Sequence, residues 1–215
     1  MKGHSERIPD KNMKSFGGKP LYHSILSELL KSKYLKKVYI DTDSDSISEN
    51  VREFFPSVSV IERPAELCGD DISMNRIINH DLKIINDEYF LQTHSTNPLL
   101  SAITIDRAIE FFFNNLDKYD SVFSVSRIQS RLYRADGTAI NHNPEDLIKT
   151  QDLPPVYEEN SNFYIFTHTS FKKAGNKRIG KRPFMFEVST LESLDIDTQS
   201  DFDMAQYVRN FLGDK

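Results

Sequence analysis

Short strand-like segments alternate with amphipathic, helix-like segments along most of the chain, and this alternation restricts the fold more than any other feature. Helices are predicted at about 20–33, 43–55, 72–86, 101–116 and 199–212, and strands at 36–41, 58–63, 88–93, 120–126, 162–166 and 184–188. Such alternation is typical of an α/β protein with a mostly parallel sheet and helices on both faces. Ligands of such sheets bind beyond the carboxyl ends of the strands.

Composition indicates one soluble domain over residues 1–215. The chain has 38% hydrophobic and 27% charged residues, its mean hydropathy is -0.51, and no apolar run approaches the ~20 residues of a membrane span. The amino terminus lacks the apolar core of a signal peptide and the single Cys68 suits a reducing compartment, so we expect a cytoplasmic protein without membrane association. The net charge of -5 argues against nucleic-acid binding, which requires a basic face.

The first nineteen residues form a basic, irregular segment on an otherwise acidic chain. Five basic residues outnumber two acidic ones there: Lys2, Arg7, Lys11, Lys14 and Lys19 against Glu6 and Asp10. Backbone N–H and ammonium groups in such a loop suit a polyphosphate ligand, although the spacing matches neither a P-loop nor a dinucleotide-binding loop. A disordered, solvated amino terminus fits the same composition equally well.

Two acidic clusters are explained by helix capping. Residues 41–45 resemble the start of an EF-hand, but the sixth position is Ser46 and the twelfth is Arg52, so the pattern of a calcium loop fails. Asp and Ser cap helices well, and the same explanation covers Asp70 and Asp71. Neither cluster therefore requires a metal.

A third acidic cluster, Asp195-Ile196-Asp197-Thr198, has a different geometry. Its two carboxylates are two residues apart at the end of an extended stretch, so both point to one side of the chain. Two such oxygen donors, completed by phosphate oxygens and water, make a usual Mg²⁺ site. From the residues alone, a capped helix start is the more frequent explanation.

The amino-terminal loop also has a specific pattern of residue types. The positions that carry it are Ser5, Pro9, Lys11 and Asn12, followed by Gly18-Lys19-Pro20-Leu21. The pattern resembles the loop Ala-Arg-x-x-Ser-Lys-x-x-Pro-x-Lys-Asn with which acylneuraminate cytidylyltransferases (CMP-sialic acid synthetases and relatives) wrap the triphosphate of CTP. Lys2 replaces the usual Arg, which keeps the charge but loses the bidentate fork, and Glu6 replaces a basic residue.

Six further motifs follow in the order of that family and extend the resemblance over essentially the whole chain. They are Thr42-Asp43-Ser44, Arg63-Pro64-Ala65-Glu66-Leu67, Thr96-Asn97-Pro98-Leu99, Lys149-Thr150-Gln151-Asp152-Leu153-Pro154, Asn160-Ser161-Asn162-Phe163-Tyr164-Ile165 and Asp195 to Asp201. The resemblance implies a nucleotide-diphospho-sugar transferase fold of Rossmann-like architecture. It also favours Mg²⁺ at Asp195 and Asp197, because the family carries an Asp-x-Asp-Thr metal motif there.

The resemblance implies nucleotidyl transfer, in which the anomeric hydroxyl of a nonulosonic (sialic-type) acid attacks the α-phosphorus of CTP and pyrophosphate leaves. The residues implied for the nucleotide are Lys2, Ser5, Lys11, Asn12 and Arg63, with Lys11 and Asp197 catalytic and Asp195 and Asp197 holding Mg²⁺. The residues implied for the sugar are Gln92, His94, Gln151 and Asn160. Counting back from Pro98 places His94 at the family's sugar-reading Gln and Gln92 two residues earlier, so the choice between them stays open.

The sequence departs from the family at its amino end. The family has a buried strand before the loop, whereas this sequence starts inside the loop, and a missing central strand would expose ladder groups and apolar side chains of its neighbours. Two other functions therefore stay open, namely another nucleotide-sugar-forming transferase and a non-catalytic nucleotide-binding assembly protein. The intact pair of Asp195 and Asp197 argues against the second.

Residues 127–160 interrupt the alternation with a long polar excursion that exceeds an ordinary connection. Its apolar residues require a partner surface; they are Ile128, Leu132, Tyr133, Ile140, Leu147 and Ile148. The resembled family places a dimerisation arm here that reaches over the neighbour's sugar pocket. We therefore expect a homodimer, with a lid that folds back on its own domain as the alternative.

Overall fold

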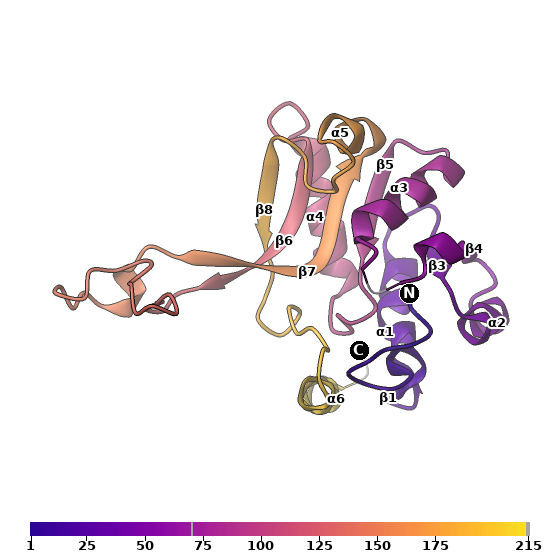
Figure 1. Cartoon of the computed structure of the whole chain (residues 1–215), viewed down its shortest axis with the longest axis horizontal. Coiled ribbons are helices and arrows are strands. Elements are labelled where there is room, and N and C mark those ends of the chain that lie inside the picture. The colour runs from indigo at the N-terminus through magenta and orange to yellow at the C-terminus, as the bar shows by residue number, and fades with distance from the viewer. Residues whose placement is uncertain (70, 214–215) are drawn as a thin grey trace.

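The computed structural model describes residues 1–69 and 71–213 (Figure 1). Its helices are α1 Tyr22–Lys31, α2 Asp45–Phe54, α3 Met74–Ile84, α4 Ala102–Asn114, α5 His168–Lys173 and α6 Gln199–Leu212. Its strands are β1 Ser15–Phe16, β2 Lys19–Pro20, β3 Tyr39–Thr42, β4 Ser59–Glu62, β5 Tyr89–Thr93, β6 Ser121–Ile128, β7 Val156–Thr167 and β8 Pro183–Glu187. Each predicted helix and strand overlaps an observed one, whereas the β1–β2 hairpin and α5 are additional. None of these helices is long and apolar enough to cross a membrane.

The strands form a mixed sheet that is split, so the predicted mostly parallel sheet is confirmed only in part. Four strands pair in the order β5-β7-β6-β8, and β7 runs antiparallel to both of its neighbours. The physical reason is that β6 and β7 are the two sides of one long hairpin, which makes them antiparallel. β3 and β4 form a separate parallel pair.

Helices cover both faces of the four-stranded sheet, as the sequence predicts. Along β7, Phe163 and Ile165 pack in one hydrophobic cluster with residues of α1 and α4. Tyr164 and Phe166 alternate with them and pack in a second cluster with residues of α3 and α5. This alternation follows from the period of two along a strand.

A third cluster brings the two ends of the chain together. Its fully buried members are Ile8, Phe16 and Leu21 from the amino-terminal part and Ile196, Phe202 and Ala205 from the carboxyl-terminal part. Burying each of the larger side chains contributes about 1.5–3 kcal/mol. The basic loop is therefore an ordered element packed against α6 and the segment before it, and the disordered alternative is wrong.

A cavity of about 1090 Å³ separates β3 from β5. Within the described residues, β3 pairs only with β4 and β5 only with β7, so one edge of each strand is unpaired. Apolar side chains such as Ile25, Leu91 and Ile109 line the space between them. The unpaired strand edges that the sequence leads us to expect beside a missing strand are thus present, whereas Ile25 and Ile109 are buried rather than exposed.

Helix caps follow the prediction in part. Ser44 caps α2, with its hydroxyl accepting from the Ile47 backbone N–H. Asp70 lies outside the described residues. α3 begins at Met74 with Ser73 at its N-cap, so the cap predicted at Asp71 is wrong, because the helix begins later than the sequence pattern indicates.

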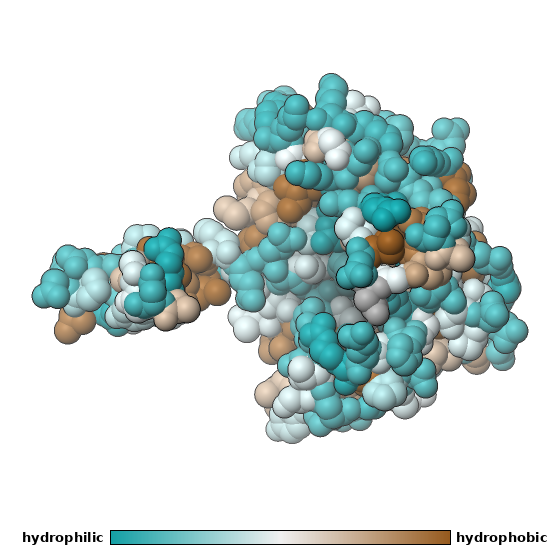
Figure 2. Space-filling model, in the orientation of Figure 1, coloured by the Kyte–Doolittle hydropathy of each residue, from teal (hydrophilic) through white to brown (hydrophobic). Residues whose placement is uncertain are grey.

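The segment between β6 and β7 projects away from the rest of the molecule (Figure 1). β6 and β7 continue into it as a two-stranded ribbon, and an isolated bridge pairs Tyr133 with Ala139 beyond the ribbon. Figure 2 shows apolar surface on this projection among polar residues, and its exposed large apolar residues include Tyr133, Ile140 and Leu147. We call residues 129–155 the arm.

Candidate active site

The basic amino-terminal loop meets the Asp195-Ile196-Asp197 motif directly. The Lys11 side chain is mostly buried, and its Nζ donates to the Ile196 carbonyl oxygen at 2.6 Å and lies 3.7 Å from Asp197 Oδ1. Arg7, which the sequence predictions did not include, lies with its NH2 3.0 Å from the same oxygen. The two predicted catalytic residues are therefore neighbours although 186 positions separate them in the sequence.

Asp195 and Asp197 are not needed to cap α6. Thr198 is the N-cap, and Asp201 accepts from the backbone N–H and the hydroxyl of Thr198 in a reciprocal capping box. Ile196 is fully buried between the two acids, so their carboxylates project to the opposite side of the chain. The helix cap is thus made by Thr198 and Asp201, and the carboxylates of Asp195 and Asp197 are left available to a ligand.

The electrostatics of this pair suit a divalent cation. The pKa of Asp195 is raised, mainly because neighbouring groups displace water from its carboxyl and also because of the like charge of Asp197. A hydrogen bond with Thr96 and the charge of Lys11 oppose this shift. Two neighbouring carboxylates are hard oxygen donors whose mutual repulsion a cation would relieve, so the residues fit Mg²⁺.

The predicted nucleotide-binding residues share one space. All of them line the 1090 Å³ cavity together with Gln92 and His94; they are Lys2, Ser5, Lys11, Asn12 and Arg63. Asn12 is buried there as a brace, because its Nδ2 donates to the Lys2 carbonyl oxygen at 2.8 Å and its Oδ1 accepts from Ser95 Oγ at 2.7 Å. Ser95 follows β5, so this brace ties the loop to the carboxyl end of that strand.

Arg63 has partners of its own. Its side chain is 3% exposed, and its Nε and NH2 both lie 2.5 Å from Asp41 Oδ1, with NH1 3.8 Å from Asp43 Oδ2. A buried guanidinium in such contact is held firmly. The structure therefore places Arg63 beside the loop as predicted, with its charge already compensated by the end of β3.

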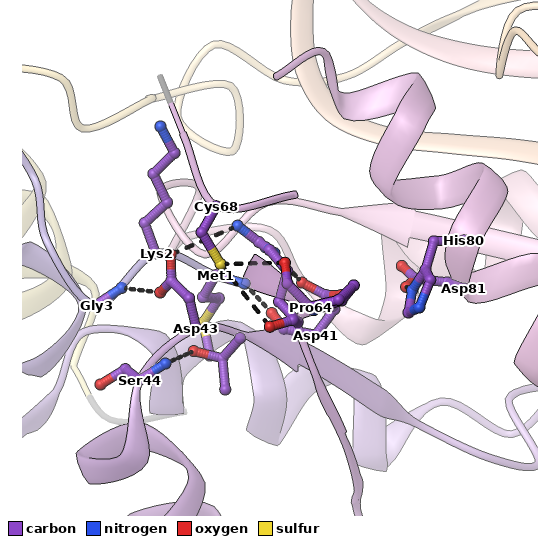
Figure 3. A network of polar contacts seen from close by, with 12 residues as sticks. Met1, Lys2, Gly3, Asp41, Asp43, Ser44, Pro64, Cys68, His80 and Asp81 are labelled. Carbon is purple, nitrogen blue, oxygen red and sulfur yellow. Dashed lines mark hydrogen bonds and ion pairs between the residues drawn. The ribbon is translucent and has the colours of Figure 1, made fainter. Parts of the chain in front are cut away.

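Asp41 belongs to a second acidic group that the sequence predictions missed. Possible ligand atoms of Asp41, His80 and Asp81 lie within 4.8 Å of one another, and Figure 3 shows the latter two projecting from one helix. Asp41 Oδ2 is buried without a hydrogen-bond partner. Burial and the charge of Asp41 raise the pKa of Asp81 to about 7. Arg63 supplies the local positive charge, so this group needs no metal.

The raised pKa makes folding stability depend on pH. Because the folded-state pKa of Asp81 lies near 7 and its ordinary value is 3.8, the folded protein binds the proton more tightly, and stability falls as pH rises from about 4 to 7. Asp81→Asn keeps a donor toward Asp41 without ionising. We expect this substitution to flatten the pH dependence and to raise the free energy of unfolding at pH 8 by about 2 kcal/mol. This is roughly half of the free energy that a shift of three pKa units represents, because Asp81 titrates jointly with its neighbour.

Urea unfolding from pH 4 to pH 8 measures this effect, with the exposed Asp117→Asn as a control for lost negative charge. A wild-type stability that rises with pH across this window, or an unchanged slope in the Asp81 variant, would contradict the assignment.

The two open candidates for sugar recognition contact the same side chain. Arg178 NH1 donates to Gln92 Oε1 at 2.7 Å and lies 3.2 Å from His94 Nε2. Burial and the positive charge of Arg178 lower the pKa of His94 to about 4, so the imidazole is neutral and its Nε2 accepts. Gln92 and His94 therefore act together on one face of the site.

The other two predicted sugar residues lie elsewhere. Asn160 is buried within β7, where its Nδ2 donates to Ser126 Oγ at 3.0 Å and its Oδ1 accepts from the Asn162 N–H, beside a register irregularity. These contacts give it a structural role. Gln151 is exposed in a 3₁₀ turn of the arm, which projects from the rest of the molecule, so within one chain the structure does not bring it to Gln92.

Sequence reasoning missed Arg7, Ser95 and Arg178. Arg7 was visible as part of the basic loop, and only its contact with Asp197 was unpredictable. Arg178 lies between α5 and β8 in a run that contains Lys177, Lys181 and Arg182 as well. This density of positive charge was the available signal for an anion-binding loop.

With this geometry in place, comparison with known proteins decides the family. The family model described as "Cytidylyltransferase" matches residues 1–211, which is nearly the whole chain. The chain belongs to the cytidylyltransferase family. The resemblance to acylneuraminate cytidylyltransferases found in the sequence is thereby confirmed.

Named relatives of this cytidylyltransferase are distant. It is 28% identical over 207 residues to the N-acylneuraminate cytidylyltransferase of Streptococcus agalactiae serotype V, covering 92% of this chain and 49% of that protein. The chain thus spans about half the length of the streptococcal relatives it matches. It is 23% identical over 214 residues to the pseudaminic acid cytidylyltransferase of Campylobacter jejuni serotype O:2, covering 90% of both chains.

Solved structures show the same fold. The structure of a CMP:2-keto-3-deoxy-manno-octonic acid synthetase complexed with CTP superposes with a TM-score of 0.74 at 11% identity, over 99% of this chain and 97% of that one. A 4-diphosphocytidyl-2C-methyl-D-erythritol synthase from Anaerococcus prevotii superposes with a TM-score of 0.67 at 13% identity, over 96% and 92%. At these identities the likeness concerns the fold alone.

Proposed function

We propose that this cytidylyltransferase transfers CMP from CTP to the anomeric hydroxyl of a nonulosonic, sialic-type acid and releases pyrophosphate. The observation that carries the proposal is the contact of Lys11 with the Asp195-Ile196-Asp197 motif, because it joins a basic loop that lines the cavity to a pair of carboxylates. Family membership over residues 1–211 supports the choice of CTP.

The residues divide the work by charge. Lys11 and Arg7 neutralise triphosphate oxygens that approach the motif, and Lys2 and Ser5 line the cavity beside them. Asn12 holds the loop in the shape that presents these groups. Positioning and charge neutralisation dominate phosphoryl and nucleotidyl transfer, so no covalent step on the protein is required.

Asp195 and Asp197 would hold the divalent cation. When bound, Mg²⁺ compensates phosphate charge and lowers the pKa of the attacking hydroxyl. Asp197 is in contact with Arg7 and Lys11. The Arg7 side chain is well exposed and can turn to a phosphate oxygen, whereas Lys11 is mostly buried and its ammonium is held by the Ile196 carbonyl.

A nine-carbon acid is the first choice of acceptor. The relatives that cover most of this chain are named for N-acylneuraminate and for pseudaminic acid, which favours an acceptor of that class. The fold match to a synthetase named for 2-keto-3-deoxy-manno-octonic acid makes that eight-carbon acid the second candidate to test. Another nucleotide sugar, or a non-catalytic role, would follow only from failure of these.

The deciding experiment measures pyrophosphate release with CTP, UTP, ATP and GTP, each with N-acetylneuraminic acid, pseudaminic acid and 2-keto-3-deoxy-manno-octonic acid, with and without Mg²⁺. We expect turnover with CTP and one of the nine-carbon acids only. Preference for another nucleotide would point to a different transferase. Tight CTP binding without turnover across the panel would favour the non-catalytic function.

We further predict a homodimer built on the arm. Its exposed apolar side chains include Tyr133, Ile140 and Leu147, and Leu132 and Ile140 are joined by a backbone hydrogen bond of 2.9 Å, which orders that stretch. In a dimer, Gln151 of one subunit could then serve the cavity of the other. We expect a dimeric mass at micromolar concentration, and a monomer with lost turnover after Leu132→Asp with Ile140→Asp.

Light scattering with a parallel activity assay tests the dimer. Ala135→Asp, at an exposed arm position between these two, controls for added negative charge and should leave the mass unchanged. A wild-type monomer with full activity would reject the arm as an interface.

A further inference from the structure

Arg178 is a largely buried cation that contacts Gln92 and His94, two residues that line the cavity. Its side chain is 16% exposed, and its guanidinium stacks on the Tyr164 ring with Cζ 3.6 Å from the ring centroid. The loop that carries it is anchored at both sides, because the Arg178 backbone N–H donates to Asn75 Oδ1 at 3.1 Å and the Gly180 N–H donates to Ser121 Oγ at 2.8 Å. The fork is therefore held in one orientation.

The charge of this guanidinium is poorly compensated. The ion pair found for it among the described residues is with Glu159, and the distance from NH2 to Oε1 is 3.9 Å. Glu159 is 44% exposed and accepts a hydrogen bond from the Tyr164 hydroxyl. Gln92 and His94 bind NH1 as neutral groups. Buried charges in proteins are normally paired closely, so an Arg in this position is prepared for an anionic ligand.

The position of Arg178 relates it to the reacting end of the site. Its partner His94 is two residues before Thr96, and two residues span at most about 7 Å. The Thr96 carbonyl oxygen accepts from the Ile196 N–H at 2.9 Å, between the two metal-binding acids. An acceptor whose hydroxyl lies at Asp195 and Asp197 would thus extend a group of its own ring toward Arg178.

We propose that Arg178 binds the carboxylate of the acceptor and so selects sugar acids over neutral sugars. This inference rests on the proposed function and adds to it the residue that recognises the acid. Gln92 and His94 contact NH1 and so fix the orientation of the Arg178 guanidinium. The rest of the guanidinium would bind the acceptor's carboxylate in the planar, bidentate way that Arg favours.

Two rival explanations make different predictions. Arg178 could bind the triphosphate of CTP instead, since phosphate and carboxylate attract the same fork. It could also serve only to fasten its loop to β5 through Gln92. Under the first alternative, loss of Arg178 would weaken CTP binding. Under the second, loss of Arg178 would lower the stability of the protein without changing its preference for a charged acceptor.

The experiment compares each acceptor acid with its own methyl ester, which keeps the ring and removes the charge. Steady-state constants for CTP, acid and ester are measured for the wild type, Arg178→Gln, Arg178→Lys and the control Lys177→Gln, which removes a positive charge from the adjacent, exposed position. Calorimetric titration with the same acids and esters measures binding without turnover.

For Arg178→Gln we expect the KM of the acid to rise roughly 30-fold and the acid-to-ester preference to disappear, with the KM of CTP within about threefold of wild type. Arg178→Lys should recover part of the preference, because charge remains without the fork. Lys177→Gln should behave as wild type.

Three results would overturn the inference. They are a larger loss for CTP than for the acid, an intact acid-to-ester preference in Arg178→Gln whatever its stability, and a wild type that binds neither N-acetylneuraminic, pseudaminic nor 2-keto-3-deoxy-manno-octonic acid. If the wild type binds an acid through Arg178 but releases no pyrophosphate, the proposed function fails and the recognition of the carboxylate stands.

Discussion

Asp197→Asn is expected to lower the Mg²⁺-dependent rate of CMP transfer by at least about a thousandfold, a barrier increase of ~4 kcal/mol. The amide replaces a charged oxygen donor with a neutral one in a site that must compensate phosphate charge. The fold should remain near wild type, because the Asp197 side chain is 46% exposed and its shorter ion pair, at 3.0 Å, is with the exposed side chain of Arg7.

The measurement is single-turnover pyrophosphate release at saturating CTP over a range of Mg²⁺ concentrations. Asp203→Asn is the matched control, because Asp203 is an exposed residue of α6, the helix that follows Asp197. This variant should retain full activity. Retention of more than about a tenth of the wild-type rate by Asp197→Asn, a change under ~1.4 kcal/mol, would show that the carboxylate does not hold the metal.

Local patterns predicted the elements well and their assembly poorly. The period of apolar residues places α6 at its observed bounds because that signal is contained within the helix itself. The direction of β7 depends on the arm that precedes it, and the separation of β3 from β5 depends on how the two sheets assemble, which no local pattern represents. Periodicity therefore indicated an α/β fold but did not indicate the reversed direction of β7 within its sheet.

The candidate site shows the same division. The resemblance of their motifs names Lys11 and Asp197 separately as catalytic residues, and the structure adds the contact that joins them. The contact of Arg178 with Gln92 spans 86 positions and belongs to no recognised motif, so only the fold reveals it. Asn160 shows the opposite error, since a residue within a motif proves to brace the strand that carries it.

Lys11→Ala is expected to weaken CTP binding about 100-fold and to change binding of the acceptor acid by less than about threefold. The ammonium is 11% exposed and is directed by the Ile196 carbonyl toward Asp197, where the phosphates would pass. A charge-assisted hydrogen bond in such a partly buried place contributes about 1.5–3 kcal/mol, which corresponds to a factor of roughly 10–150 in Kd.

Calorimetric titration of CTP and of the acceptor acid separates the two effects. Lys19→Ala, at an exposed position of the same basic segment, removes the same charge and should leave both affinities near wild type. Lys11→Arg should keep part of the CTP affinity, because its charge remains while its longer fork no longer fits the Ile196 carbonyl. Equal losses for CTP and acid in Lys11→Ala would mean that Lys11 supports the loop as a whole, and the triphosphate would then have to be bound elsewhere along it.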